Sequence, residues 1–152
     1  MNVHSLREGE YEISTDPLRL DIDMIHMFLT GSYWAEGIPR EIVERSIRHS
    51  LCIGAYTGSQ QIGFARVISD FATYAYVADV FVLEPFRGKG IGKLLMRCIM
   101  SHPNLQGLRR WSLLTRDAHG LYRQSGFGEP RHPERYMEIS NPGIYRTGRT
   151  KS

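Results

Sequence analysis

The sequence predicts a mixed α/β fold, in which a mostly antiparallel central sheet carries helices on both faces. Three strand-like apolar runs follow one another between residues 51 and 83 with short turns between them, which is typical of antiparallel strands. A strand, a long helix and another strand then follow in residues 74–115, and a crossover helix of this kind joins parallel strands. The predicted fold therefore differs from a doubly wound parallel sheet.

The N-terminal third predicts one weak strand and two helices. Residues 10–14 alternate weakly between polar and apolar side chains and favour an edge strand. Asp21 is a good N-cap for a helix that continues to about Thr30 with one apolar face. Pro39 can begin a second amphipathic helix.

The rest of the chain alternates between strands and helices. We expect strands over residues 51–56, 62–68 and 74–83, a helix over 91–102, a strand over 110–115, a helix that Asp117 caps and Gly126 ends, and a last strand over 135–139. The long helix is the clearest of these, because its apolar residues recur at the spacing of one helical face. These residues are Ile91, Leu94, Leu95, Cys98 and Ile99.

Length and composition narrow the class of protein. Residues 1–152 are enough for a single domain, with a core over residues 10–139 and a solvated tail over 140–152. A net charge of +3 is too small to indicate nucleic acid as a partner, and no apolar run is long enough to cross a membrane. Cys52 and Cys98 lie in apolar segments, which favours buried free thiols and a cytoplasmic protein. No Cys/His spacing indicates a metal site.

A glycine-rich turn separates the strand over residues 74–83 from the long helix. It consists of Arg87, Gly88, Lys89, Gly90, Ile91, Gly92 and Lys93. Glycines let a backbone turn its N–H groups toward an anion, and a helix N-terminus adds partial positive charge, so the turn predicts a phosphate site. The P-loop and dinucleotide motifs do not match, because they require a different spacing. A plain tight turn is the alternative without a ligand.

Arg87, Gly90 and Gly92 match the pattern Arg/Gln-x-x-Gly-x-Gly/Ala. This pattern resembles the coenzyme A pyrophosphate loop of the GNAT superfamily, the GCN5-related N-acetyltransferases. The order of elements is also similar to the GNAT arrangement over nearly the whole chain. The resemblance implies that acetyl-CoA is the cofactor and that residues 87–93 hold its pyrophosphate. It also implies that the strands over 74–83 and 110–115 splay apart around the pantetheine arm.

The same resemblance implies roles for residues near the end of the first of these strands and on the following helix. In GNAT proteins, backbone N–H groups at the positions of Phe81, Val82 and Leu83 receive the thioester carbonyl and the pantetheine amide. Tyr122 matches a tyrosine that commonly protonates the departing thiolate, and a core tyrosine is the alternative. Asp117 stands where the family often has a cofactor-contacting Asn, and it can equally cap the helix.

A general base is harder to assign. Asp79 is an acid within an apolar strand and is therefore a candidate, but family members with a base on this strand place it about three residues earlier, at Tyr76. Asp79 can instead be a satisfied structural carboxylate, or the amine can lose its proton through water. His119 is a further, weaker candidate for a catalytic role.

The acceptor pocket has two contradictory clues. The segment with Tyr33, Trp34 and Glu36 lies where GNAT proteins build one wall of this pocket, and two aromatic rings with a carboxylate suit a cationic amine. The same aromatic residues can instead hold the loop on the core. Arg66 would attract an acidic acceptor, so the charge of the acceptor stays open.

The resemblance therefore predicts an acetyl-CoA-dependent N-acetyltransferase that needs no metal. A primary amine of a small molecule or peptide would attack the thioester directly, with neither nucleic acid nor membrane as a partner. GNAT domains often pair, so a homodimer is compatible with the prediction. A non-catalytic acyl-CoA sensor or interaction module on the same fold is the main alternative, and an ATP-binding protein is a weaker one.

Overall fold

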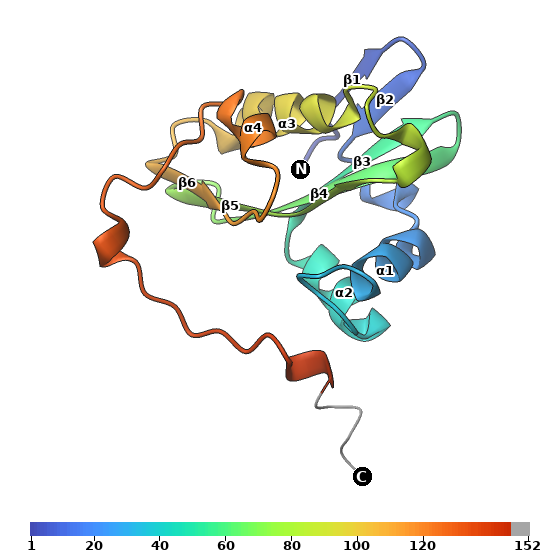
Figure 1. Cartoon of the computed structure of the whole chain (residues 1–152). Coiled ribbons are helices and arrows are strands. Elements are labelled where there is room, and N and C mark those ends of the chain that lie inside the picture. The colour runs from blue at the N-terminus through green and yellow to red at the C-terminus, as the bar shows by residue number, and fades with distance from the viewer. Residues whose placement is uncertain (147–152) are drawn as a thin grey trace.

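A six-stranded sheet forms the centre of the part of the chain that the computed structural model describes, residues 1–146 (Figure 1). The strands lie side by side in chain order, and all neighbours are antiparallel except β5 and β6, which are parallel. The strands are β1 (Ser5–Glu8), β2 (Tyr11–Ser14), β3 (Leu51–Thr57), β4 (Gln60–Ser69), β5 (Tyr74–Val82) and β6 (Arg110–Leu113).

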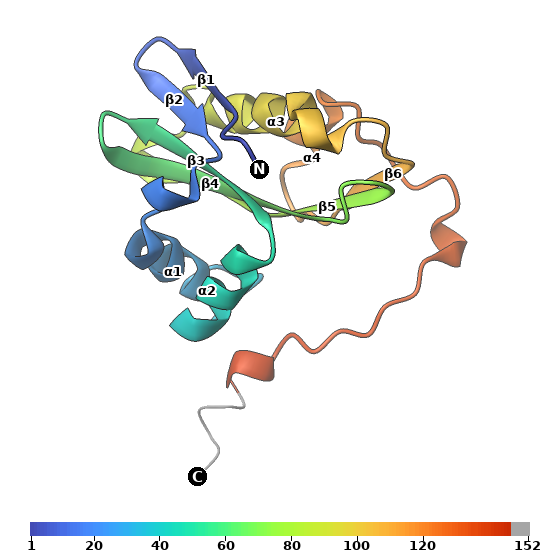
Figure 2. The same cartoon turned by 180° about the vertical axis from the view of Figure 1, so that it is seen from behind.

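Two helices cover each face of the sheet (Figures 1 and 2). The first pair is α1 (Ile22–Thr30) and α2 (Arg40–Arg48), and the second pair is α3 (Ile91–Ser101) and α4 (His119–Arg123). Short 3₁₀ turns occupy Pro17–Arg19, Glu84–Phe86, Pro103–Leu105 and Pro133–Arg135. This arrangement confirms the predicted mixed fold with helices on both faces. Among residues 1–146, no helix has the length and apolar character that crossing a bilayer requires.

Local signals place most helix starts as expected. The Asp21 side chain accepts a hydrogen bond from the Met24 N–H at 3.1 Å and caps α1. Pro39 precedes the first residue of α2, as predicted. The strand β1 was not predicted, because its four residues are mostly exposed and carry no apolar alternation. It exists because Gly9, at a φ of +61°, turns the chain back so that β1 pairs with β2.

Each face of the sheet has its own hydrophobic core. The α3 core, between the sheet and α3 and α4, contains the predicted apolar face of α3. The α1 core lies between the sheet and α1 and α2. Cys98 belongs to the first core and Cys52 to the second, and both thiols are free, as predicted. Burial raises the pKa of Cys52 to about 12 and that of Cys98 to about 11, so neither is a thiolate at neutral pH.

A β-bulge at Asp79 changes which face of the sheet the alternate side chains of β5 point to near the end of the strand. The pairing with β4 shifts register there, and Asp79 has a φ of +54°, in the left-handed region. Val77 packs into the α3 core before the bulge, whereas Val80 and Val82 pack into it after the bulge. The extra residue thereby turns Phe81 toward the α1 core. The pairing of β5 with β6 ends just before this bulge, at Val77.

The strands β5 and β6 part near the end of β5, as the family resemblance implied. Their parallel pairing begins at Tyr74 and Arg110 and ends at Val77 and Leu113. Beyond that point β5 continues to Val82 without a neighbour on the β6 side. The sheet therefore opens next to the glycine-rich turn, which follows β5 directly.

The predicted strand over residues 135–139 is wrong. A 3₁₀ turn ends at Arg135, and the following residues run extended and exposed without joining the sheet. The segment then returns to the loop after α1, where Arg146 pairs with Glu36 at 3.0 Å. A strand forms only where a neighbouring edge accepts its hydrogen bonds, and β6 accepts none from this segment within the described chain. The remainder of the expected tail, residues 147–152, lies outside the described residues.

Candidate active site

The glycine-rich turn holds two residues in the left-handed region. Gly88 has a φ of +78° and Gly90 a φ of +83°. A Cβ at either position would meet no atom within 4 Å, so backbone conformation rather than space requires glycine there. Gly92 is different, because its Cβ would meet the Leu121 side chain at 3.4 Å. Its lack of a side chain lets α4 pack closely on the start of α3.

The turn presents a row of backbone N–H groups with no acceptor. In the described chain, the first hydrogen bond of α3 runs from Leu94 N–H to the Gly90 carbonyl at 3.1 Å. No bond uses the N–H groups of residues 88–93, and residues 87–90 are exposed. Unsatisfied N–H groups at a helix N-terminus favour a bound anion. The turn therefore has the accessibility that a pyrophosphate site needs.

A cleft of about 680 Å³ lies beside this turn. It is bounded by α1 and the loop that follows, by the end of β5, and by the loop that follows β6. Its lining residues are Met24, Met27, Phe28, Gly31, Ser32, Tyr33, Trp34, Val80, Phe81, Val82, Leu83, Arg87, Arg116 and Asp117. The structure thus brings together the expected cofactor residues at the end of β5 and two of the expected acceptor residues, Tyr33 and Trp34.

The backbone N–H groups of Phe81, Val82 and Leu83, which are expected to bind the thioester and pantetheine, do not all point to the same side of β5. Leu83 donates its N–H to the Ile62 carbonyl of β4 at 2.8 Å, and Phe81 points its N–H the same way by the alternation of a strand. The N–H of Val82 therefore faces the opening beside β6. Its carbonyl faces the same side, because it accepts a hydrogen bond from Arg87 Nε at 2.9 Å. Of the three N–H groups, Val82 alone offers one to the cleft.

An aromatic wall lines the cleft opposite the strand edge. Phe28 of α1 stacks on Phe81 with ring centroids 3.8 Å apart, and its ring centroid lies 6.3 Å from that of Trp34. Tyr33 meets Trp34 edge to face at 5.1 Å. The sequence analysis missed Phe28, because an aromatic residue on an amphipathic helix is usually an ordinary core residue. Phe28 contacts Phe81 at the cleft only because the bulge at Asp79 turns Phe81 toward α1.

Asp79 is held by two side chains. Its Oδ1 accepts a hydrogen bond from Trp34 Nε1 at 2.8 Å, and its Oδ2 accepts one from Arg66 Nε at 2.8 Å. The Asp79 side chain is 10% exposed and that of Arg66 is 16% exposed, so the pair is mostly buried. Arg66 also donates to Ser50 Oγ at 3.1 Å. The structure thus shows the satisfied carboxylate that was one alternative for Asp79, and it leaves Arg66 already paired.

A second cation, which the sequence analysis missed, reaches across the cleft mouth. The guanidinium of Arg116 lies over the Tyr33 ring, 3.7 Å from its centroid, and the Arg116 N–H donates to the Tyr33 hydroxyl at 3.3 Å. These contacts join the loop after β6 to the loop after α1. In the sequence, Arg116 is a single arginine after a predicted strand, and such residues are too common for one of them to indicate a binding site.

Tyr122 belongs to the α3 core and is not itself among the residues that line the cleft, although the cleft residues Tyr33 and Asp117 influence its hydroxyl electrostatically. The residue as a whole is 9% exposed, and its ring packs near Phe127, with ring centroids 6.2 Å apart. The hydroxyl has no hydrogen-bond partner within the described residues, and it is not sealed from solvent. Burial, with smaller contributions from Tyr33 and Asp117, raises the pKa of Tyr122 to about 12. The phenol is therefore protonated at neutral pH, with its proton unshared.

Asp117, just before α4, and His119, its first residue, were both candidates for functional roles. The prediction that Asp117 caps α4 is wrong, because the helix starts after Ala118 and Thr115 Oγ1 accepts the Ala118 N–H at 3.0 Å. The exposed Asp117 carboxylate instead lines the cleft, 4.0 Å from Arg116. His119 is exposed and does not line the cleft.

Glu36 does not face the acceptor side of the cleft. It pairs with Arg146 at 3.0 Å, and it is absent from the cleft lining. The described lining therefore contains two arginines, Arg87 and Arg116, and one carboxylate, that of Asp117. The cleft has a small excess of positive charge, which favours an anionic ligand.

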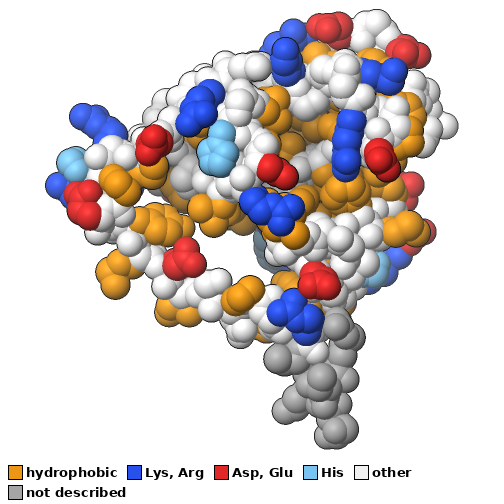
Figure 3. Space-filling model, in the orientation of Figure 1, with side chains coloured by type: hydrophobic (Ala, Val, Ile, Leu, Met, Phe, Trp, Pro, Cys, Tyr) orange, Lys and Arg blue, Asp and Glu red, His pale blue; other side chains and the backbone are white. Residues whose placement is uncertain are grey.

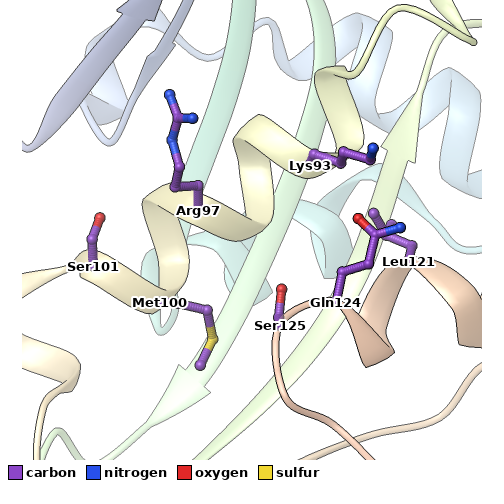
Figure 4. A pocket seen from close by; sticks show the side chains of 7 residues that line it. All are labelled: Lys93, Arg97, Met100, Ser101, Leu121, Gln124 and Ser125. Carbon is purple, nitrogen blue, oxygen red and sulfur yellow. The ribbon is translucent and has the colours of Figure 1, made fainter.

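A second hollow of about 430 Å³ lies between α3 and α4 (Figure 4). Lys93 and Arg97 project from α3 on one side, and Gln124 and Ser125 follow α4 on the other (Figure 4). Arg97 also pairs with Glu8 at 3.2 Å. Because Lys93 belongs to both this hollow and the glycine-rich turn, the polar surface continues from the turn along α3. Among residues 1–146, no three His, Cys, Asp or Glu side chains gather in the way that a metal site requires.

Comparison with known proteins identifies the family. The sequence model of the acetyltransferase (GNAT) domain matches residues 48–129. A Gibberella zeae protein named as a candidate acetyltransferase is 32% identical in an alignment 137 positions long, which covers 75% of this chain and 76% of that protein.

Solved structures agree with this match. A candidate GNAT acetyltransferase from Xanthomonas campestris pv. campestris is 50% identical, with a TM-score of 0.86 over 95% of this chain and 97% of that one. A candidate acetyltransferase from Clostridium acetobutylicum, solved with acetyl-CoA, is 14% identical with a TM-score of 0.61 over 91% of this chain and 95% of that one, which shows the shared fold alone. The family match, the splayed strands and the open glycine-rich turn agree, and the chain belongs to the GNAT family of acetyltransferases.

Proposed function

We propose that this protein is an acetyl-CoA-dependent N-acetyltransferase that transfers the acetyl group to a primary amine by direct attack. The observation that carries the proposal is the row of N–H groups at residues 88–93, which have no acceptor within the described chain and follow an exposed turn beside a cleft that contains the edge of β5. This arrangement fits a diphosphate at the turn and an extended arm along the splayed strand.

The glycine-rich turn would hold the pyrophosphate of acetyl-CoA. The N–H groups of residues 88–93 supply donors, and Arg87, Lys89 and Lys93 supply positive charge on both sides of them. A charge-assisted hydrogen bond contributes roughly 1.5–3 kcal/mol when water is excluded. The exposed lysines contribute less, because solvent screens their charge. The hollow beside Lys93 leaves room for the nucleotide end of the cofactor along α3.

The end of β5 would orient the acetyl group. Bound acetyl-CoA supplies a thioester whose carbonyl carbon is the electrophile. The Val82 N–H faces the splay, so it is placed to donate to a carbonyl oxygen that gains negative charge during attack. Arg87 now occupies the Val82 carbonyl, and moving its side chain toward the pyrophosphate would free that carbonyl for the pantetheine arm.

Tyr122 would act as the proton donor to the sulfur of the departing thiolate. Its hydroxyl is protonated, because burial raises its pKa to about 12, and it has no competing acceptor in the described structure. The aromatic wall of Phe28, Tyr33 and Trp34 would exclude water from the reacting atoms and contact the acceptor.

Deprotonation of the amine does not require Asp79. Both of its oxygens already accept hydrogen bonds, one from the Trp34 indole and one from the Arg66 guanidinium, and Asp79 is not among the residues that line the cleft. We assign Asp79 instead to positioning, because it links Trp34 of the aromatic wall to Arg66 of β4. The amine then loses its proton to water at the mouth of the cleft.

Replacing Gly90 by Asp tests the cofactor site. The Gly90→Asp variant should bind coenzyme A at least about 100-fold more weakly by calorimetry, about 2.7 kcal/mol, because its carboxylate repels the pyrophosphate. Gly58→Asp is a matched control, since Gly58 also has a positive φ (+58°) and open space but lies in the turn between β3 and β4. Equal affinities for the two variants would show that the turn does not bind the cofactor.

Thiol release from acetyl-CoA with a panel of amines tests the transfer itself. Release that depends on both protein and amine supports the proposal, with the acetylated amine identified by mass spectrometry. Coenzyme A binding without release for any amine would instead indicate the acyl-CoA sensor that the sequence left as an alternative.

A further inference from the structure

Arg116 is the guanidinium that the cleft leaves without an acceptor. No hydrogen bond within the described chain uses its side chain, and the carboxylate of Asp117 lies 4.0 Å away, beyond hydrogen-bond distance. The Arg116 and Asp117 side chains are 65% and 70% exposed, so solvent weakens their attraction. Arg116 therefore keeps its hydrogen-bond donors and most of its charge for a ligand.

The two other arginines near the cleft already have partners. Arg87 donates to the Val82 carbonyl and stands beside the glycine-rich turn, so it belongs to the proposed cofactor site. Arg66, which the sequence made a candidate for attracting an acidic acceptor, is bound to Asp79 at 2.8 Å and does not line the cleft. Of these three arginines, Arg116 is the one placed to bind an acidic group of the acceptor.

Contacts with Tyr33 hold Arg116 at the cleft. The guanidinium lies 3.7 Å from the centroid of the Tyr33 ring, and the Arg116 backbone N–H donates to the Tyr33 hydroxyl. A guanidinium is planar, and its N–H groups point outward in that plane, so stacking on a ring covers one face and leaves the N–H edge open. The fork of donors on this edge matches the two oxygens of a carboxylate.

Arg116 stands at one end of the aromatic wall. Tyr33 meets Trp34 edge to face, and Trp34 lies near Phe28. Phe28 in turn stacks on Phe81, near the end of β5. In the space-filling view, acidic and basic side chains are scattered over the visible face without a broad patch of one sign (Figure 3). The cleft therefore suits a small ligand with one anionic group and an apolar body, rather than a polyanion.

We propose that the acceptor is an amino acid, whose carboxylate is bound by Arg116 and whose apolar body lies against the aromatic wall. This inference rests on the proposed function, because it names the acceptor of the same transfer. The amine of the bound molecule attacks the thioester, so that a nitrogen–carbon bond forms and the carbon–sulfur bond breaks. The nitrogen loses one proton to water, and the sulfur receives one from Tyr122, which water then restores.

Matched acids and amides test this assignment. Phenylalanine, methionine, β-alanine and γ-aminobutyrate are each compared with their carboxamides in acetyl-CoA-dependent thiol release. At least one acid should exceed its amide by about tenfold or more in kcat/KM, which is about 1.4 kcal/mol. The comparison is stringent, because a carboxylate favours the protonated form of the nearby amine and so lowers the reactive neutral fraction of the acid. Turnover with amides equal to or better than acids in every pair would overturn the proposal.

The variant Arg116→Met assigns this preference to one residue. Its kcat/KM for the preferred acid should fall about tenfold, while its kcat/KM for the amide and its affinity for coenzyme A by calorimetry change less than about twofold. Arg131→Met is the matched control, since Arg131 is an exposed arginine after α4 that does not line the cleft, and this variant should keep the preference. Equal losses for acid and amide, or weaker coenzyme A binding, would overturn the role of Arg116.

Binding of the acetylated products needs no turnover, so it separates this inference from the proposed function. The N-acetyl forms of the same four pairs are titrated with and without coenzyme A, and the NMR signal of the Trp34 indole N–H reports binding at the aromatic wall. Trp111→Phe assigns that signal, because the chain has two tryptophans. At least one acid should bind about tenfold more tightly than its amide, and this difference should vanish in Arg116→Met.

The two measurements fail in different ways. Tighter binding of the acids without thiol release from any amine would refute the transfer and keep the carboxylate site. Thiol release with equal affinities for acids and amides in every pair would support the transfer and refute the carboxylate site.

Discussion

Replacing Asp79 and Arg66 singly and together separates a positioning role for Asp79 from a role as general base. The side chains are 10% and 16% exposed and lie 2.8 Å apart, so the pair is intermediate between a surface ion pair and a buried one. Surface pairs contribute about 0–1 kcal/mol, and breaking a buried pair costs about 3–5 kcal/mol. We therefore expect a coupling free energy of about 2–3 kcal/mol between Asp79→Asn and Arg66→Met.

The Asn replacement is chosen because it tolerates the left-handed backbone at position 79 and can still accept from Trp34. Urea unfolding of the wild type, the two single variants and the double variant gives the coupling through a double-mutant cycle. A coupling below about 0.5 kcal/mol would refute the view that the pair organises the end of β5.

The pH dependence of the same variants decides the catalytic question. If Asp79 only positions Trp34, Asp79→Asn should lower kcat/KM for acetyl transfer while the shape of the pH profile stays as in the wild type. Loss of the acidic limb of the profile in Asp79→Asn would instead identify Asp79 as the base. If Asp79 is the base, the double variant Asp79→Asn/Arg66→Met should also be as inactive as Asp79→Asn alone.

Two further predictions concern tyrosine and histidine side chains. Tyr122→Phe should lower kcat at least about tenfold with little change in coenzyme A affinity by calorimetry, and an unchanged kcat would place the proton donor elsewhere. Burial, and to a smaller extent the charge of His4, holds the pKa of His102 below its ordinary value of 6.5, so the unfolded chain binds this proton more readily than the folded one. Stability should therefore fall as pH drops below about 6.5, by up to about 1.4 kcal/mol per pH unit, and His102→Gln should reduce this slope in urea unfolding while the exposed His49→Gln does not.

The elements that could be predicted from the sequence are those that depend on interactions between residues close together in the chain. The cap at Asp21, the apolar face of α3 and the glycines at 88 and 90 depend on interactions within a few residues, so the pattern itself carries the information. The splay between β5 and β6 was anticipated by family resemblance, and the end of their pairing at Val77 confirms it.

Elements that depend on distant partners were missed or wrong. β1 has almost no apolar pattern and exists through its pairing with β2. Residues 135–139 have a strand-like pattern, but no edge of the described chain pairs with them. Asp117 does not cap α4, because the helix begins one residue later than expected, after Ala118, whose N–H the Thr115 hydroxyl accepts.

The candidate site divides in the same way. Short-range sequence determined the glycine-rich turn, because glycine conformation and a helix N-terminus are local properties. Only the tertiary structure placed Phe28 and Arg116 at the cleft, neutralised Arg66 with Asp79, and turned Glu36 toward Arg146. Which charges face a cleft depends on contacts between segments far apart in the chain, and those contacts form only when the sheet and its helices pack together.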